Sequence, residues 1–338
     1  MTPEFTNLVD LASERLGGAV VYANDDFFAP KENLLKASAP VWREGAYTER
    51  GKWMDGWESR RRRTPGFDWC LVRLGAPGHV RGVVVDTSYF TGNYPAECSL
   101  EGCAAAPDAT VEELTGEATE WVELLRQTGL HGNYENEFAV VHAAGRFTHL
   151  RFKIYPDGGV ARLRVYGEVL PDWDSIKRAG GLVDLAAVEN GGMVVATSDE
   201  FYGHRHNLLI PGRAADMSDG WETKRRRGPG YDWCVIRLGA RGTLRRVEVD
   251  TAHFKGNFPE SCSLKVCRAP DPSATDEATL TALPWRELLP RTRLQAHTRH
   301  FYEAELSEAG AVTHALFRIY PDGGVSRLRL YGSLAEDA

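Results

Sequence analysis

The sequence predicts an all-β protein built from two tandem jelly-roll β-sandwich domains. At 338 residues the chain is longer than one ordinary hydrophobic core covers, so two domains of about 150 residues each are expected. The second half repeats the motifs of the first half in the same order. Short β-branched or alternating segments, separated by turns rich in glycine and proline, are typical of β-sandwiches.

Three pairs of matching blocks carry the repeat. They are 55–70 with 219–234, 86–99 with 250–263, and 148–167 with 313–332. In the first pair twelve of sixteen positions are identical, which excludes coincidence. The stretch 171–181 has the proline and paired glycines of a linker, so the predicted domains are residues 1–173 and 174–338.

Near the start of the chain, a short helix is expected over residues 6–16. Thr6 or Asn7 is suited to cap its beginning, and Gly17 is suited to end it. Further along, the first copy carries extra residues around 46–52 that the second copy lacks, which predicts a loop insertion.

The later elements are expected to be strands. Residues 80–86 are β-branched and apolar, 147–155 alternate in polarity, and 160–166 place several polar side chains on one face. The sequence Tyr-Pro-Asp-Gly-Gly at 155–159 contains the residues that turns require. It predicts a hairpin between the last two strands.

Composition narrows the class of protein. A net charge of −7 and a pI near 5.9 oppose nucleic-acid binding, which depends on a cationic surface. The chain lacks an apolar run near the roughly 18 residues of a membrane helix, and residues 1–10 do not resemble a signal peptide. A soluble, cytoplasmic protein is therefore expected. Cys98 and Cys103 are an odd number of residues apart, which favours buried free thiols over a disulfide.

The basic run at 60–63 lies between Trp57-Glu58 and Asp68-Trp69, and 224–227 is its counterpart. Guanidinium groups are well shaped to bind a carboxylate ligand. A solvated loop with internal ion pairs explains the same pattern, so both interpretations stay open.

Two further residue types recur at matched positions. Asn93 and Asn257 are expected in rim loops, where an amide suits a ureido ligand, although capping of a local turn is an equal alternative. His149 and His314 are expected on strands, as candidates for general acid or base or as core histidines bonded to backbone.

Metal and cofactor chemistry have little support. His204 and His206 share a face if extended, but the first copy has Pro30 and Glu32 there and no clear third ligand is present. The sequence contains no Walker loop, dinucleotide-binding glycine pattern, nucleophile elbow or metalloprotease helix. Neither a metal nor a cofactor is predicted.

The blocks Asp-Gly-Trp-Glu-x-x-Arg-Arg-Arg, Pro-Gly-x-Asp-Trp-Cys, Asp-Thr-x-x-Phe-x-Gly-Asn-x-Pro and Tyr-Pro-Asp-Gly-Gly-Val-x-Arg-Leu-Arg, repeated in order, resemble the allantoicase family over nearly the whole chain. The resemblance implies jelly-roll domains of the galactose-binding type. It also implies hydrolysis of allantoate, a small-molecule substrate, to (S)-ureidoglycolate and urea in purine breakdown.

Allantoate carries one carboxylate and two ureido groups on a single carbon, so hydrolysis needs a carboxylate clamp, amide partners and proton transfer, but no serine or cysteine nucleophile. The candidates for proton transfer are Glu58, Glu222, His149, His314 and His253. The candidates for substrate binding are Arg61, Arg62, Arg225, Arg226, Asn93, Asn257, Lys255, Trp57 and Trp221.

The two copies differ at positions that affect this chemistry. Tyr89 and Thr91 of the first copy become His253 and Lys255, which favours one active site, in the second copy or at the junction. Two alternatives remain: a noncatalytic tandem carbohydrate-binding module, and a related hydrolase acting on ureidoglycolate. A homo-oligomer is a further expectation.

Overall fold

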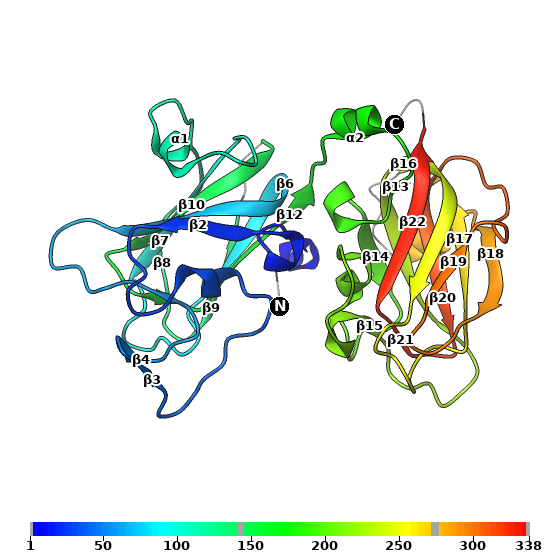
Figure 1. Cartoon of the computed structure of the whole chain (residues 1–338), viewed down its shortest axis with the longest axis horizontal. Coiled ribbons are helices and arrows are strands. Elements are labelled where there is room, and N and C mark those ends of the chain that lie inside the picture. Colours follow the sequence, from blue (N-terminus) through cyan, green and yellow to red (C-terminus); the bar gives the residue numbers. More distant parts are fainter. Residues whose placement is uncertain (1–2, 141–144, 272–276, 336–338) are drawn as a thin grey trace. The chain divides into compact units, whose positions relative to one another are not determined.

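A computed structural model of the chain describes residues 3–140, 145–271 and 277–335. The chain folds into two units, Met1–Pro171 and Asp172–Ala338. Each unit is a β-sandwich whose large sheet contains eight strands (Figure 1). The prediction of two tandem β-sandwich domains is therefore confirmed.

The long strand β6 (Asp68–Asp86) is the centre of the first domain. Its first part, near Cys70, and its last part, near Val84, pair with different strands, so β6 belongs to both layers of the sandwich. The layer at Cys70 also holds β2 (Ala19–Ala23), β10 (Phe147–Tyr155), β7 (Glu97–Cys103) and β8 (Val122–Gly129). The layer at Val84 also holds β9 (Glu135–Ala139), β12 (Arg162–Val169) and β1 (Val9–Asp10).

The second domain repeats this arrangement around β16 (Asp232–Asp250), which also belongs to both layers. One layer holds β14 (Met193–Thr197), β20 (Val312–Tyr320), β17 (Ser261–Cys267) and β18 (Arg286–Arg293). The other holds β19 (Arg299–Tyr302), β22 (Arg327–Leu334) and β13 (Val183–Asp184).

Short elements complete both domains. The two-stranded pairs are β5 (Trp57–Glu58) with β11 (Gly159–Val160), β15 (Trp221–Glu222) with β21 (Gly324–Val325), and β3 (Tyr47–Thr48) with β4 (Gly51–Lys52). The helices are α1 (Val111–Thr115), α2 (Trp173–Ala179) and α3 (Glu277–Thr281), with 3-10 turns at Glu4–Asn7, Glu14–Leu16, Lys31–Leu35, Val188–Asn190, Arg205–Leu209 and Met217–Asp219. Within the described residues, every helix is too short to cross a membrane.

The helix expected over residues 6–16 is wrong. Only short 3-10 turns form there, and the strand β1 lies between them. The Asp10 carboxylate accepts hydrogen bonds from the backbone N–H of Ala12 at 3.2 Å and of Val165, in β12, at 3.0 Å. This long-range pairing outweighs the local helical preference, as tertiary contacts often do.

The hairpin expected at 155–159 is also wrong, although a turn does occur there. The strands on either side of it, β10 and β12, lie on opposite sides of β6 and do not pair with each other. The residue Gly159 instead begins β11, which pairs with β5. The predicted linker 171–181 contains the helix α2, whose beginning is capped by Asp172.

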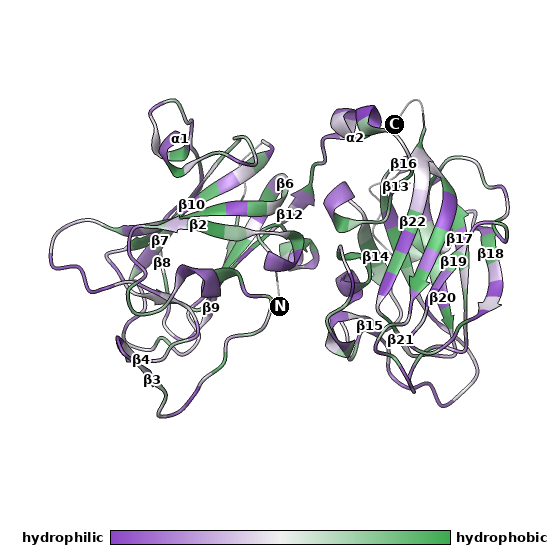
Figure 2. Ribbon diagram, viewed as in Figure 1, coloured by the Kyte–Doolittle hydropathy of each residue, from purple (hydrophilic) through white to green (hydrophobic). Residues whose placement is uncertain are grey.

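The core lies between the layers of each sandwich. Hydrophobic and hydrophilic residues alternate along many of the strands (Figure 2), as expected when one face of a strand is buried. All six cysteines are buried free thiols, as predicted. Burial raises the pKa of Cys98 to about 12 and that of Cys103 to about 11, so these thiols stay protonated and unreactive.

The turn that ends in Gly159 packs tightly against the ring of Phe90. A Cβ atom added at Gly159 would lie 1.9 Å from this ring, which is fully buried. Gly324 has the same relation to Phe254 in the second domain, again at 1.9 Å. The second glycine of each Asp-Gly-Gly turn is therefore required by packing.

We predict that Gly159→Ala lowers the free energy of unfolding of the first domain by about 1–3 kcal/mol, because the ring or the turn must move. Urea denaturation followed by tryptophan fluorescence measures this loss. Gly92→Ala is the control, since a Cβ there meets no atom within 4 Å. Equal losses in the two variants would contradict the packing argument.

Candidate functional site

A glutamate and an asparagine from two of the repeated blocks meet in each domain. The Asn93 side-chain amide donates a hydrogen bond to Glu58 Oε1 at 2.7 Å. In the second domain, Asn257 donates to Glu222 Oε1 at 2.5 Å. The sequence predicted all four residues as candidates, and the structure brings them together as two matching pairs.

The backbone around Gly159 positions the pair in the first domain. Gly159 is the β-bridge partner of Glu58, and its N–H donates to the carbonyl oxygen of Asn93 at 2.7 Å. Before this loop, the Thr87 hydroxyl donates to the carbonyl oxygen of His131 at 2.6 Å. That bond holds the 131–134 segment, and with it Asn133, beside the loop of Asn93.

The Glu58–Asn93 pair lies in a cleft of about 710 Å³. Its walls are Phe28, Trp42, Gly51, Lys52, Met54, Tyr89, Thr91 and Asn133. Such a volume is suited to a small molecule. The polar side chains that line it comprise one carboxyl group, one ammonium group, two amides and two hydroxyls.

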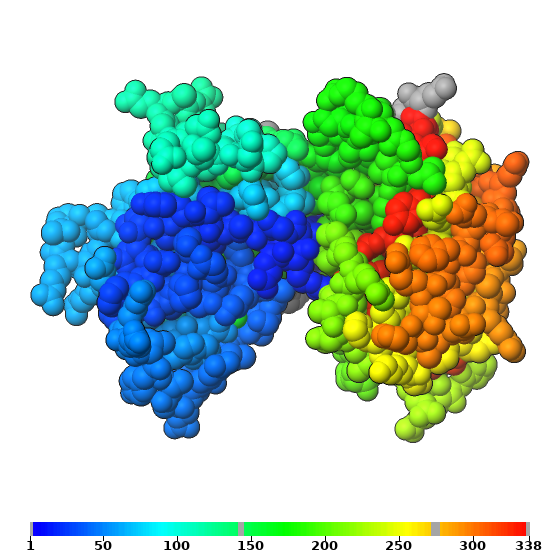
Figure 3. Space-filling view, viewed as in Figure 1, coloured from blue at the N-terminus to red at the C-terminus, as the bar shows by residue number. Residues whose placement is uncertain are grey.

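The segment 42–54, which contains the predicted insertion 46–52, supplies Lys52 and Trp42 to this cleft. The hairpin of β3 and β4 contains Lys52, whose Nζ lies 4.1 Å from the centre of the Trp42 ring. The Trp42 ring in turn lies 5.9 Å from that of Tyr89. In Figure 3 this hairpin is part of the blue projection at the surface of the first domain. Sequence reasoning missed both residues, although the insertion was the signal that could have found them.

Glu58 is suited to act as an acid. Its burial raises the pKa of the carboxyl group, and the hydrogen bond from Asn93 only partly opposes this effect. A raised pKa keeps a larger fraction of the group protonated as the pH approaches neutrality, which is what a general acid needs.

The cleft of the second domain, of about 720 Å³, contains the Glu222–Asn257 pair but a different cationic group. Arg225, Arg226 and Arg293 line it, together with acidic and aromatic side chains. Arg226 is already occupied by an ion pair with the buried Asp232. Arg225 is exposed and makes no ion pair with any described residue, so it can receive a carboxylate.

The arginines of the first domain lie elsewhere. Arg62 pairs with the buried Asp68 at 2.5 Å, and its backbone N–H donates to Asp157 at 2.8 Å. Arg61 is exposed. Neither residue lines the first cleft. The side chain of Arg62 therefore holds the loop 59–67 in place, as the internal ion-pair interpretation expected.

The tryptophans predicted to contact substrate are buried in the core. Trp57 and Trp221 have no exposed surface. Their indole N–H groups donate to the carbonyl oxygens of Asp25 at 2.8 Å and Asp199 at 2.9 Å. They are therefore left out of the proposed site, because a substrate in either cleft cannot reach them.

The strand histidines are also buried away from both clefts. His149 and His314 each bond through Nδ1 to the hydroxyl of the preceding threonine at 3.0 Å. Burial lowers the pKa of both, that of His314 to about 4, and so favours the neutral form of both rings. The core interpretation fits them, with a threonine hydroxyl as the partner in place of the expected backbone carbonyl.

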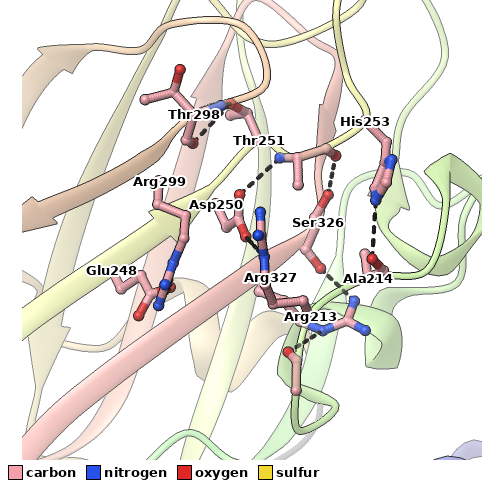
Figure 4. A network of polar contacts seen from close by, with 12 residues as sticks. Arg213, Ala214, Glu248, Asp250, Thr251, His253, Thr298, Arg299, Ser326 and Arg327 are labelled. Atoms are coloured by element: carbon pink, nitrogen blue, oxygen red, sulfur yellow. Dashed lines mark hydrogen bonds and ion pairs between the residues drawn. The ribbon is translucent and has the colours of Figure 1, made fainter.

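His253 and Lys255 led us to expect the active site in the second copy, but neither residue lines the cleft of the second domain. His253 Nε2 lies 3.0 Å from the carbonyl oxygen of Ala214 (Figure 4), and Lys255 is exposed on the following loop.

The rings of His204 and His206 lie 5.0 Å apart. Among the described residues, no group of three potential metal ligands occurs.

Comparisons with known proteins agree with the repeated motifs. The allantoicase repeat model matches residues 9–170 and 183–335. A probable allantoicase of Burkholderia mallei is 49% identical over 98% of this chain and 96% of its own length. An allantoicase of Dictyostelium discoideum is 47% identical over 97% of this chain and 87% of its own length. The crystal structure of Saccharomyces cerevisiae allantoicase is 35% identical, with a TM-score of 0.82 over 98% of this chain and 96% of that chain.

We predict that Asn93→Ala raises the pKa of Glu58 further, because the hydrogen bond that stabilises the carboxylate is lost. An NMR titration of protein labelled with ¹³C in the glutamate carboxyl groups measures this pKa, and Glu58→Gln assigns the signal. Asn257→Ala, the matched change in the second domain, should leave the pKa of Glu58 unchanged. A fall in that pKa in Asn93→Ala would show that hydration of the opened cleft matters more than the hydrogen bond.

Proposed function

We propose, from the premise that the chain belongs to the allantoicase family, that it hydrolyses allantoate to (S)-ureidoglycolate and urea in the cleft of the first domain. One observation carries the placement. Glu58, whose pKa is raised, shares a single cleft with the ammonium group of Lys52 and the amides of Asn93 and Asn133.

The polar groups of this cleft match those of the substrate. The Lys52 ammonium can bind the carboxylate of allantoate, and the aromatic ring of Trp42 beside it limits competing water. The amides of Asn93 and Asn133 can each donate and accept hydrogen bonds, as a ureido group requires. Binding of these groups would hold the central carbon of the substrate close to Glu58.

Glu58 can then transfer the protons that hydrolysis needs. Its neutral carboxyl group donates a proton to the nitrogen of one ureido arm, and the bond from that nitrogen to the central carbon breaks as urea leaves. The electron pair on the nitrogen of the other arm forms a C=N bond to the same carbon. Water adds to this carbon and gives a proton to the Glu58 carboxylate, which restores the neutral acid.

Asn93 supports both forms of Glu58 in this cycle. Its amide already donates to Glu58 Oε1, so it stabilises the carboxylate that forms when urea leaves. The burial that raises the pKa of Glu58 returns the proton once water has added. A single carboxyl group thus serves as acid and then as base.

The matched pair of variants Glu58→Gln and Glu222→Gln tests the placement. We predict that Glu58→Gln lowers kcat for urea release from allantoate by about a hundredfold or more, because glutamine cannot transfer the proton. Glu222→Gln should change kcat by less than about threefold, since its glutamate lies in the other domain. The reverse result would place the reaction in the second cleft. A wild-type protein that releases no urea would favour the noncatalytic binding module.

The two cations give a second matched test. We predict that Lys52→Met raises KM for allantoate by about tenfold or more, because the carboxylate loses its ionic partner. Arg225→Met should leave KM nearly unchanged. Steady-state kinetics with allantoate, and with ureidoglycolate to compare the two acids, measures both. If KM rises only in Arg225→Met, the carboxylate of allantoate binds the basic segment 224–227, as the sequence suggested.

We propose further that the enzyme works in the cytoplasm as a homo-oligomer. The cytoplasmic location is supported by six buried free thiols, which fit a reducing compartment. The homo-oligomer stays a prediction from the two-domain architecture. Light scattering by the purified chain measures the number of copies in the assembly.

A further inference from the structure

A small slot lies on the outer face of the second domain, apart from both clefts. It has a volume of about 260 Å³, and its walls come from β16, β20, α3 and the residues that immediately precede β16 and β18. The apolar walls include Trp233, Trp285, Leu280 and Leu316, and Arg318 lies at the polar side. Trp233 and Arg318 face each other across neighbouring strands.

The same place in the first domain is filled by a side chain of that domain. There Arg151 occupies the position of Leu316, and its guanidinium carbon lies 4.6 Å from the centre of the Trp121 ring. Glu101 holds it in place, at 2.6 Å from Arg151 and 2.9 Å from Lys153. The first domain therefore covers its tryptophan with an internal ion-pair network.

Two substitutions open this place in the second domain. Leucine at 316 replaces the arginine that would cover Trp285, and Lys265 replaces the carboxylate of Glu101. The third member of the network, Lys153, is replaced by another cationic residue, Arg318. The second domain therefore lacks the side chains that correspond to Arg151 and Glu101. Arg318 is left beside the partly exposed rings of Trp233 and Trp285.

Arg318 lacks the partner that its counterpart has. Its guanidinium group stacks on Tyr231 at 4.7 Å, and its buried Nε–H has no hydrogen-bond acceptor among the described residues. Among the described residues no carboxylate pairs with the Arg318 guanidinium group, so an anionic ligand would supply the ionic partner that Glu101 supplies to Lys153. Lys265 adds a second positive charge on the same face, and the nearest acidic group in register is Glu287 on β18.

We propose that this slot binds a small planar aromatic carboxylate. Two tryptophans suit a flat ring, and Arg318 suits its carboxylate. A cavity of about 150 Å³ is large enough to bind benzene, so the observed slot has room for one ring and a carboxylate. It is too small for a peptide helix or strand. The inference does not depend on which cleft hydrolyses allantoate.

Benzoate is the probe, and benzamide is its neutral analogue. We predict that benzoate binds the full-length protein with a dissociation constant on the order of 0.1–1 mM, as a ligand of this size allows. Saturation-transfer NMR and isothermal titration calorimetry measure the binding. Benzamide should bind about tenfold or more weakly, because it carries no charge for Arg318.

Variants assign the binding to the slot. Leu316→Arg combined with Lys265→Glu rebuilds the ion pair of the first domain and should abolish benzoate binding while urea release stays unchanged. Arg318→Met should weaken benzoate about tenfold and leave benzamide unaffected. Lys153→Met, the matched change in the first domain, should leave both affinities unchanged.

Three results would overturn the proposal. These are no saturable binding of benzoate up to about 10 mM, equal affinity in wild type and in the double variant, and equal affinity for benzoate and benzamide. A ¹H–¹⁵N NMR spectrum of the double variant with the dispersion of the wild type excludes misfolding of the second domain as the cause of lost binding.

Discussion

The bond from the Gly159 N–H to the carbonyl oxygen of Asn93 is the constraint on which the rest of the site depends. Gly159 is also the β-bridge partner of Glu58, so one residue fixes the positions of both members of the pair. The ring of Phe90 packs against Gly159 and leaves no room for a side chain. Gly324 and Asn257 repeat the bond at 2.9 Å in the second domain. Three blocks that are distant in sequence thus converge at one end of each sandwich.

The sequence alone was sufficient to predict the two β-sandwich domains and to name Glu58, Asn93 and their counterparts as candidates, but not their pairing or the separate roles of the repeated residues. A residue is repeated when both domains need it, and both domains need the residues that hold the fold and its loops. Repetition alone therefore does not identify residues that contact substrate. Trp57 and Arg62 are repeated because they hold the loops, through Asp25 and Asp68. Glu58 is repeated at the rim of a cleft. Spacing does not separate these cases, because the distinction depends on burial and on partners far along the chain.

The differences between the copies are more informative about chemistry than the identities. Both clefts contain a glutamate bonded to an asparagine, but Lys52 supplies the cation in one and Arg225 in the other. The framework fixes the carboxyl–amide pair, while neighbouring segments set the charge around it. The same principle acts on the outer faces, where Leu316 leaves open a slot that Arg151 fills in the other copy.

A buried ion pair explains why an insertion is tolerated next to the site. Asp55 accepts from the buried Arg162 at 2.8 Å and from the backbone N–H of Val41, fourteen residues earlier, at 3.0 Å. In the second domain Asp219 accepts from Arg327 at 2.9 Å and from the N–H of Ala215, only four residues earlier, at 2.9 Å. The anchors are the same, and the ten additional residues of the first copy lie between them. A buried ion pair is weak evidence for net stability, but the bonds of Asp55 to Arg162 and to Val41 keep both ends of this segment fixed. The segment can then lengthen and bring Lys52 to the cleft without moving Glu58.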